Sequence, residues 1–291
     1  GQNILMGYAG QLSLGSAGFM AAGAFACYNL ILRVPGIPFL AAVLLSGLIA
    51  AIIGILFGLP SLRIRGLYLA VATLASQFFV VWAIDKFGWF KNYDTSGIIT
   101  AQNIVIFGRV FDTPGEKYFI VLCIVSVLTL LAANMARGRT GRGWRAVRDM
   151  DVAAEAMGLS LLRTKLQAFA ISSFYCGVGG ALFLFAYLQT AEPAAFSIEL
   201  SFRILFMVII GGLGTILGPF LGSAFILLLP IFLNIFFHTF FGRAMDASIA
   251  SALEQVIFGM LIILFLIFEP LGLARLWQVT KERLRLWPFR Y

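Results

Sequence analysis

Long apolar segments alternate with shorter polar ones along the whole chain, and most approach the ~20 residues that cross a bilayer core. Eight such segments can be marked, at residues 4–32, 38–62, 67–84, 118–136, 166–188, 202–217, 218–240 and 251–270. The ~10-residue alternating strands of a membrane barrel are not found. The pattern predicts an all-α polytopic membrane bundle of about eight spans, forming a single domain over residues 1–291.

The composition agrees with this prediction. Of 291 residues, 61% are hydrophobic and only 12% are charged, with a mean hydropathy of +0.97. A soluble surface needs roughly twice that share of charge. The net charge of +8 could indicate nucleic acid as a partner, but in so apolar a chain it favours basic cytoplasmic loops. Cys27, Cys123 and Cys176 lie singly in apolar segments, which predicts neither a metal site nor a disulfide framework.

The basic residues predict a topology. The stretch 137–165 is rich in arginine, so it is placed in the cytoplasm, and the other loops follow by alternation. Fourteen basic residues then lie inside: Arg63, Arg65, Arg137, Arg139, Arg142, Arg145, Arg148, Arg163, Lys165, Arg275, Lys281, Arg283, Arg285 and Arg290. Seven lie outside: Arg33, Lys86, Lys91, Arg109, Lys117, Arg203 and Arg243. The tail at 271–291 is therefore cytoplasmic, and 85–117 and 238–250 face outward.

Two apolar segments are unusually rich in glycine and hydroxyl groups. They read GYAGQLSLGSAGFMAAGAF (7–25) and IIGGLGTILGPFLGSAF (209–225). Glycine permits either close helix packing in lipid or a broken helix beside a cavity, and both alternatives stay open. Paired interrupted segments are typical of permeation sites. The predicted pathway residues are Gln11, Ser13, Ser16, Thr73, Gln77 and Thr215.

The spacing of the polar residues sharpens this prediction. Gln11 and Ser13 are two residues apart, so both can reach one path only if the helix breaks near Gly10 or Gly15. Thr73 and Gln77 share one helix face, because they are separated by one helical turn.

The chain shows no chemistry of its own. Asp85, Glu254 and Glu269 lie at the ends of spans, and His238 lies near the outer boundary, so no coupling-ion site is visible in mid-membrane. The phosphate-binding motif G-x-x-x-x-G-K-[ST] is absent from the sequence. We therefore predict no catalytic residue, no metal and no bound cofactor.

The inner stretch 137–165 contains good helix formers from Trp144 to Met157, and Gly158 can end that helix. Arg145, Arg148 and Asp149 give it a charged face. Such a helix could lie on the membrane surface or dock into a groove of a partner protein.

Four motifs together resemble a known family. In order they are GYAGQLSLGSAGF, GLYLAVATLA, GRGWRAVRDMDVAAEAMGLSLLRTKLQAFAISS and IIGGLGTILGPFLGSA. They are similar to the LivM-type permease subunit of ABC importers for branched-chain amino acids, whose relatives serve urea, amides and aromatic acids. The resemblance implies a coupling helix that contacts an ATPase, through Arg145, Arg148, Asp149, Ala154, Glu155, Ala156 and Gly158. It also implies a further helix upstream of Gly1.

The resemblance implies the partners as well. These are a second permease (LivH-like or identical), two cytoplasmic ATP-binding subunits that use ATP and Mg, an external solute-binding protein and the lipid bilayer, but no nucleic acid. The location would be the cytoplasmic (inner) membrane of a bacterium or archaeon. The alternatives are a stand-alone secondary transporter or channel and a membrane scaffold, neither of which should co-purify with ATPase subunits.

Overall fold

The computed structural model describes residues 1–61, 67–94, 96–106, 108–241 and 272–286, with isolated helical positions between 256 and 267. The chain divides into two compact units, residues 1–202 and 203–291, and each is described by itself. Most of the predicted span at 251–270 and most of the outer loop at 238–250 fall outside the described residues, as does the side chain of His238.

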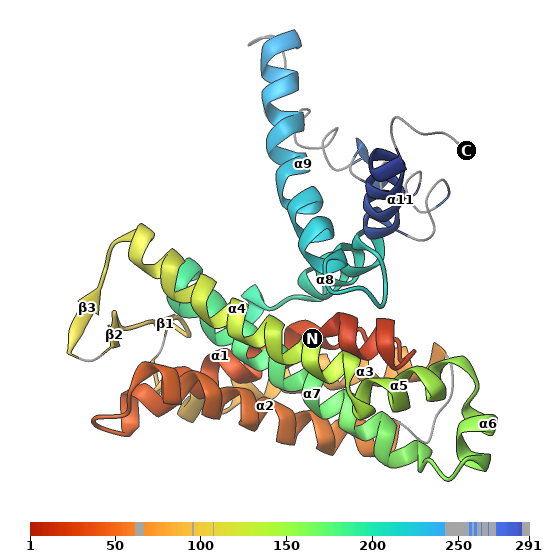
Figure 1. Cartoon of the computed structure of the whole chain (residues 1–291). Helices are drawn as coiled ribbons and strands as arrows, with labels where there is room; N and C mark the ends of the chain where they lie inside the picture. The colour runs from red at the N-terminus through yellow and green to blue at the C-terminus, as the bar shows by residue number, and fades with distance from the viewer. Residues whose placement is uncertain are drawn as a thin grey trace. The chain divides into compact units, whose positions relative to one another are not determined.

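The first unit is a bundle of helices (Figure 1). In chain order they are the π-helix η1 (Ile4–Tyr8), α1 (Ser16–Arg33), α2 (Phe39–Ser61), α3 (Leu67–Lys86), the 3-10 helix η2 (Gly88–Lys91), α4 (Pro114–Arg137), α5 (Arg139–Asp149), α6 (Asp151–Ala156), α7 (Leu161–Leu182), the π-helix η3 (Phe183–Leu188), the 3-10 helix η4 (Pro193–Ala195) and the start of α8 (Ile198–Gly211).

Five helical segments in the described residues are long and apolar enough to cross a membrane. They are Phe39–Pro60, Tyr68–Lys86, Pro114–Arg137, Leu161–Leu188 and Pro193–Gly211. The prediction of a mostly helical membrane bundle is confirmed. The predicted span at 202–217 has the wrong bounds, because α8 already ends at Gly211 and the glycines after it form a turn.

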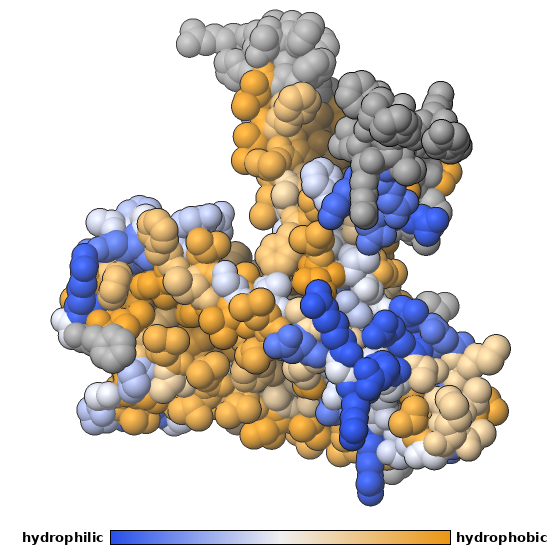
Figure 2. Space-filling view, viewed as in Figure 1, coloured by the Kyte–Doolittle hydropathy of each residue, from blue (hydrophilic) through white to orange (hydrophobic). Residues whose placement is uncertain are grey.

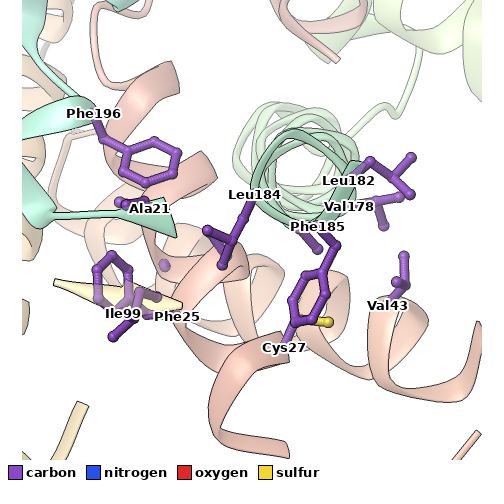
Figure 3. Packing of buried hydrophobic residues seen from close by; sticks show 14 of the residues in the cluster. Ala21, Phe25, Cys27, Val43, Ile99, Val178, Leu182, Leu184, Phe185 and Phe196 are labelled. Carbon is purple, nitrogen blue, oxygen red and sulfur yellow. The ribbon is translucent and has the colours of Figure 1, made fainter. Parts of the chain in front are cut away.

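The core of the first unit lies where α1, α2 and α7 meet. Side chains from these helices, among them Phe25, Val43 and Val178, interdigitate there (Figure 3). Glycines bring the backbones together: a Cβ at Gly23 of α1 or at Gly180 of α7 would overlap backbone atoms of the facing helix. In lipid such close packing is a main source of helix association.

The structure has four short strands in its described residues, which the all-α prediction missed; three lie in the stretch 85–117 and the fourth follows η3. β1 (Ile99–Thr100) pairs antiparallel with β4 (Thr190–Ala191), and β2 (Ile104–Ile106) pairs antiparallel with β3 (Arg109–Phe111). Strands of two or three residues leave no measurable period in the sequence. The β1–β4 pair also joins segments that are distant in sequence, so no local pattern marks it.

The strands and α5 lie at opposite ends of the bundle (Figure 1). Figure 2 shows a hydrophobic belt over the first unit, with hydrophilic side chains gathered at the β2–β3 end and at the α5 end. A belt between two polar ends is the surface expected of a membrane-spanning bundle. It agrees with the prediction that 85–117 and 137–165 face opposite sides.

The second unit comprises most of α8, α9 (Gly218–Phe241) and α11 (Leu273–Leu286). Between α8 and α9 the chain turns through Gly212 and Gly214, whose φ angles are +112° and +74°. Ile210 and Ile226 are buried against each other, and Leu273 at the start of α11 packs on them.

Candidate functional site

The first apolar segment is a broken helix. η1 ends at Tyr8, residues 9–15 are not helical, and α1 begins at Ser16. Gly10 has a φ of +67°, which only glycine adopts without strain. The backbone N–H of Gln11 donates to the Leu5 carbonyl at 3.0 Å, which closes the end of η1. Of the two alternatives that the glycines left open, the structure has the broken helix, with the break between Tyr8 and Ser16. The break leaves backbone polar groups that need partners.

A serine from α8 caps the new helix start. The Ala17 amide N–H donates to Ser201 Oγ at 2.9 Å, and the Ser16 hydroxyl lies 3.4 Å from the same oxygen. Ser201 in turn donates to Gln77 Oε1 on α3 at 2.6 Å. Ser16, Gln77 and Ser201 are all buried. The Ser201 hydroxyl therefore joins α1, α3 and α8. It takes the place of an N-cap side chain, because the residue at the N-cap of α1 is Gly15.

The predicted polar face of α3 lies against the break. Thr73 Oγ1 accepts a hydrogen bond from the Leu14 amide N–H at 3.0 Å while donating to the Ala70 carbonyl. Glycines allow this approach, because a Cβ at Gly15 would lie 2.6 Å from the Thr73 carbonyl oxygen. The structure thus brings Thr73, Gln77 and Ser16 together.

Ser13 and Gln11 differ in their hydrogen bonding. The Ser13 hydroxyl accepts from the Gly15 amide N–H at 3.3 Å, and its carbonyl accepts from Gln2 Nε2 at 2.6 Å. Gln11 is only 3% exposed, yet neither its amide nitrogen nor its amide oxygen has a partner among the described residues. An unpaired buried polar group costs about 1–3 kcal/mol, so Gln11 is the group in the break that still needs a partner.

Two members of this cluster escaped the sequence analysis. Ser201 and Gln2 carry no local signal, because a lone serine at a helix start or a glutamine near a chain end is ordinary. Only the folded chain shows that both support the break. Thr215, the remaining predicted pathway residue, lies in the second unit. Its hydroxyl donates to the Gly212 carbonyl and accepts from the Gly218 N–H, both at 3.0 Å, which closes the α8–α9 turn.

The cytoplasmic helix predicted from Trp144 to Met157 is wrong as a single element. Met150 is extended (φ −151°, ψ 96°) and separates α5 from α6. No breaker residue marks the kink, so tertiary packing sets it: Asp151 lies 3.9 Å from Lys165 on α7, and Ala154 is fully buried.

Gly158 ends α6 as predicted. It has a φ of +86°, and its N–H bonds to the Glu155 carbonyl at 2.9 Å. The next amide N–H, of Leu159, bonds to the Ala154 carbonyl at 3.1 Å. This pair of bonds is the Schellman arrangement that glycine favours at helix ends.

The two arginines of α5 bond within the chain. Arg145 donates to the carbonyls of Gly141 and Ala136, at 3.2 and 2.9 Å. Arg148 Nη1 donates to the Gly7 carbonyl in η1 at 2.6 Å, and its Nε donates to Asp149 at 2.8 Å. Sequence reasoning did not foresee that both guanidinium groups have partners in this chain.

The exposed surface of α6 and its flanks is mixed in character. Met150, Val152 and Met157 are each more than 70% exposed, and Glu155 and Ala156 are exposed beside them. Large exposed apolar side chains on a polar end of the bundle are typical of a contact surface.

In the described residues no group of three or more His, Cys, Asp or Glu side chains is placed to hold a metal ion.

Comparison with known proteins decides the family. The profile described as "Branched-chain amino acid transport system / permease component" matches residues 1–266. The chain belongs to this permease family. The branched-chain amino acid permease LivM of Salmonella typhimurium is 28% identical over 98% of this chain and 68% of the relative, and that of Escherichia coli is 29% identical over the same shares.

A more distant relative of the permease is archaeal. The probable branched-chain amino acid permease LivM of Methanocaldococcus jannaschii is 25% identical over 80% of this chain and 67% of its own length. No solved structure matches. The resemblance to LivM-type permeases is confirmed, and the chain is a transporter subunit of the ABC importer class by its family.

Proposed function

We propose that this permease is the membrane subunit of an ATP-driven importer for a branched-chain amino acid or a related small polar solute. The observation that carries the proposal is the side-chain amide of Gln11, which lies buried in a helix break of a permease-family chain and has no hydrogen-bond partner among the described residues. A primary amide offers two donors and one acceptor, which suits a solute with both an ammonium and a carboxylate group.

The path would run beside the break. Irregular backbone at membrane depth is tolerated where it lines a cavity or is buried in protein. Gln11, Ser13, Ser16, Thr73 and Gln77 supply the polar groups there. Thr215, in the second unit, is the remaining proposed pathway residue. Because Ser201 and Thr73 already bond the backbone of the break, they would shape the site while Gln11 contacts the solute.

The α5–α6 pair would be the coupling element. Its exposed Met150, Val152 and Met157, beside the exposed acidic residues Asp149 and Glu155, form a mixed apolar and acidic surface, which fits a groove on a partner protein. The partners would be two ATPases that use ATP and Mg, a second permease and an external binding protein. About eight spans in the cytoplasmic membrane of a bacterium or archaeon would complete the subunit.

Co-purification in mild detergent, followed by reconstitution, tests the function. The permease should bring ATP-binding subunits with it, and the complex should take up radiolabelled leucine only when ATP and the binding protein are present. Uptake without ATP, or a permease that purifies alone, would favour a stand-alone transporter.

Replacing Glu155 with lysine should uncouple the importer. Glu155 is exposed, and only its backbone takes part in the helix end, so the substitution should leave the permease inserted and folded. Like charges placed across an interface are strongly unfavourable, so uptake should fall by more than roughly tenfold. Glu155→Gln, which removes the charge without reversing it, is the matched control. Normal uptake and ATPase stimulation in Glu155→Lys would contradict a contact here.

Single cysteines at positions 139 and 113 should label from opposite sides of the membrane. Arg139 and Thr113 are both exposed, and the elements that carry them lie at opposite ends of the apolar belt. The background would lack Cys27, Cys123 and Cys176. An impermeant thiol reagent added outside should reach only position 113. Labelling of both positions from one side would overturn the topology.

A further inference from the structure

The C-terminal end of η1 has a carbonyl whose usual partner is displaced. In a continuous α-helix the backbone N–H of Gln11 would donate to the Gly7 carbonyl, four residues earlier. Here the Gln11 N–H bonds to the Leu5 carbonyl instead, at 3.0 Å. The Gly7 carbonyl is left open at the negative end of a helix segment, where a cation is favourable.

Arg148 occupies that position. Its Nη1 lies 2.6 Å from the Gly7 oxygen, and Asp149 holds the same guanidinium through Nε at 2.8 Å. The approach depends on Gly10, because a Cβ there would lie 2.6 Å from Arg148 Cγ. The Arg148 side chain therefore fits two independent features of the break: it bonds to the Gly7 carbonyl, and it occupies the space beside Gly10 that a larger residue would fill.

The rest of α5 supports the same contact. Trp144 lies four residues before Arg148 and Val147 directly precedes it, and both are buried. Trp144 belongs to the apolar cluster that contains Ile4, Leu5 and Tyr8 of η1. The helix α5 is thus packed against the first half-helix, with Arg148 at the polar edge of this contact.

We propose that Arg148 is a positioning residue that links the α5–α6 pair to the helix break. In this way it sets where the side-chain amide of Gln11 lies. The break has two hydrogen-bond arrangements. In the observed one, Arg148 holds the Gly7 carbonyl and Gln11 N–H bonds to Leu5. In the other, Arg148 withdraws with α5, Gln11 N–H moves to the Gly7 carbonyl, and the helix extends through Gln11. The switch rotates the Gln11 side chain.

This inference rests on the proposed function for its consequence, because movement of α5 would come from the ATPases. Its structural part does not depend on them. A local two-state element that both sites bias is the physical requirement for coupling between distant sites. Here the two-state element is the helix break. At the α5–α6 pair the position of α5 favours one arrangement of the break, and at the Gln11 side chain a bound solute does so.

Hydrogen exchange on the full-length permease tests the structural part. In Arg148→Gln, the balance should shift about tenfold toward the extended helix, as expected for the loss of one charge-assisted hydrogen bond, so the backbone amides of residues 10–13 should exchange more slowly. Amides of residues 19–33 in α1 should not change. Arg148→Lys keeps a cationic donor and should restore part of the wild-type exchange. Arg142→Gln is the control, since Arg142 is exposed on the same helix and its side chain donates to the Arg137 carbonyl rather than to η1. Unchanged exchange in Arg148→Gln would overturn the inference.

The assembled, reconstituted importer tests the functional part. Arg148→Gln and Gly10→Ala should retain their ATPase subunits but take up about tenfold less leucine per ATP hydrolysed. Arg148→Lys should recover part of the ratio, and Arg142→Gln should be normal. If Arg148→Gln lowers yield or stability while the ratio stays at the wild-type value, Arg148 is only structural and the inference fails. If the wild-type permease brings no ATPase, the proposed function fails, and the exchange result still decides the link.

Discussion

Gln11→Leu should lower uptake by about tenfold or more without harming assembly. Leucine has roughly the volume of glutamine, and the amide it replaces makes no hydrogen bond within the described chain. Removing an unpaired buried polar group is neutral or stabilising, so the melting temperature should stay level or rise. If the amide contacts the solute, uptake should fall by about tenfold or more, because a hydrogen bond to a charged group is worth roughly 1.5–3 kcal/mol.

Gln77→Leu is the matched control for that variant. Gln77 is equally buried, but its Oε1 accepts a hydrogen bond from Ser201 at 2.6 Å. Its loss should lower the melting temperature, because the hydroxyl network at the start of α1 would be broken. Stability and uptake should therefore separate in Gln11→Leu and fall together in Gln77→Leu. Wild-type uptake in Gln11→Leu would mean that the break serves packing alone.

Gly180→Ala should prevent the permease from accumulating, whereas Gly179→Ala should be harmless. Both glycines lie in α7, and alanine is the better helix former by about 1 kcal/mol. A Cβ at Gly180 would overlap the backbone of Met20 in α1, while a Cβ at Gly179 would meet nothing within 4 Å. Forcing a methyl group against backbone costs ~3 kcal/mol or more, which exceeds the gain in propensity.

Membrane yield and thermal stability of the two adjacent alanine variants measure this difference. Equal yields would show that α1 and α7 do not approach as closely as described. The result also separates two roles of glycine in this chain. Gly180 and Gly23 serve helix contact, while Gly10 serves a turn with positive φ.

The sequence predicted the parts of the fold that carry a strong local signal. Apolar length gave the helices and their membrane character. The glycines of residues 7–25 allowed either a broken or a continuous first helix, and the structure has the broken one. The face shared by Thr73 and Gln77 followed from helical period and meets the break as expected. Gly158 ended its helix because a residue with positive φ was needed there.

Other features depend on contacts between distant residues and had no local signal. The kink at Met150 comes from packing of α6 on α7. The cap of α1 comes from Ser201, which lies 184 residues after Ala17, whose backbone N–H donates to it. Arg148 looked like part of an exposed charged face. Its partner, the Gly7 carbonyl, becomes available only because the first helix is broken.

Solute protection of a cysteine at position 11 tests the central claim most directly. The variant Gln11→Cys, in a background without Cys27, Cys123 and Cys176, would be assembled with its partners and exposed to a small water-soluble thiol reagent. Because position 11 is 3% exposed in the described state, the account predicts labelling only while the importer turns over with ATP. It also predicts that saturating leucine slows this labelling. Absence of labelling in every state, or labelling that leucine does not change, would contradict a solute path beside the helix break.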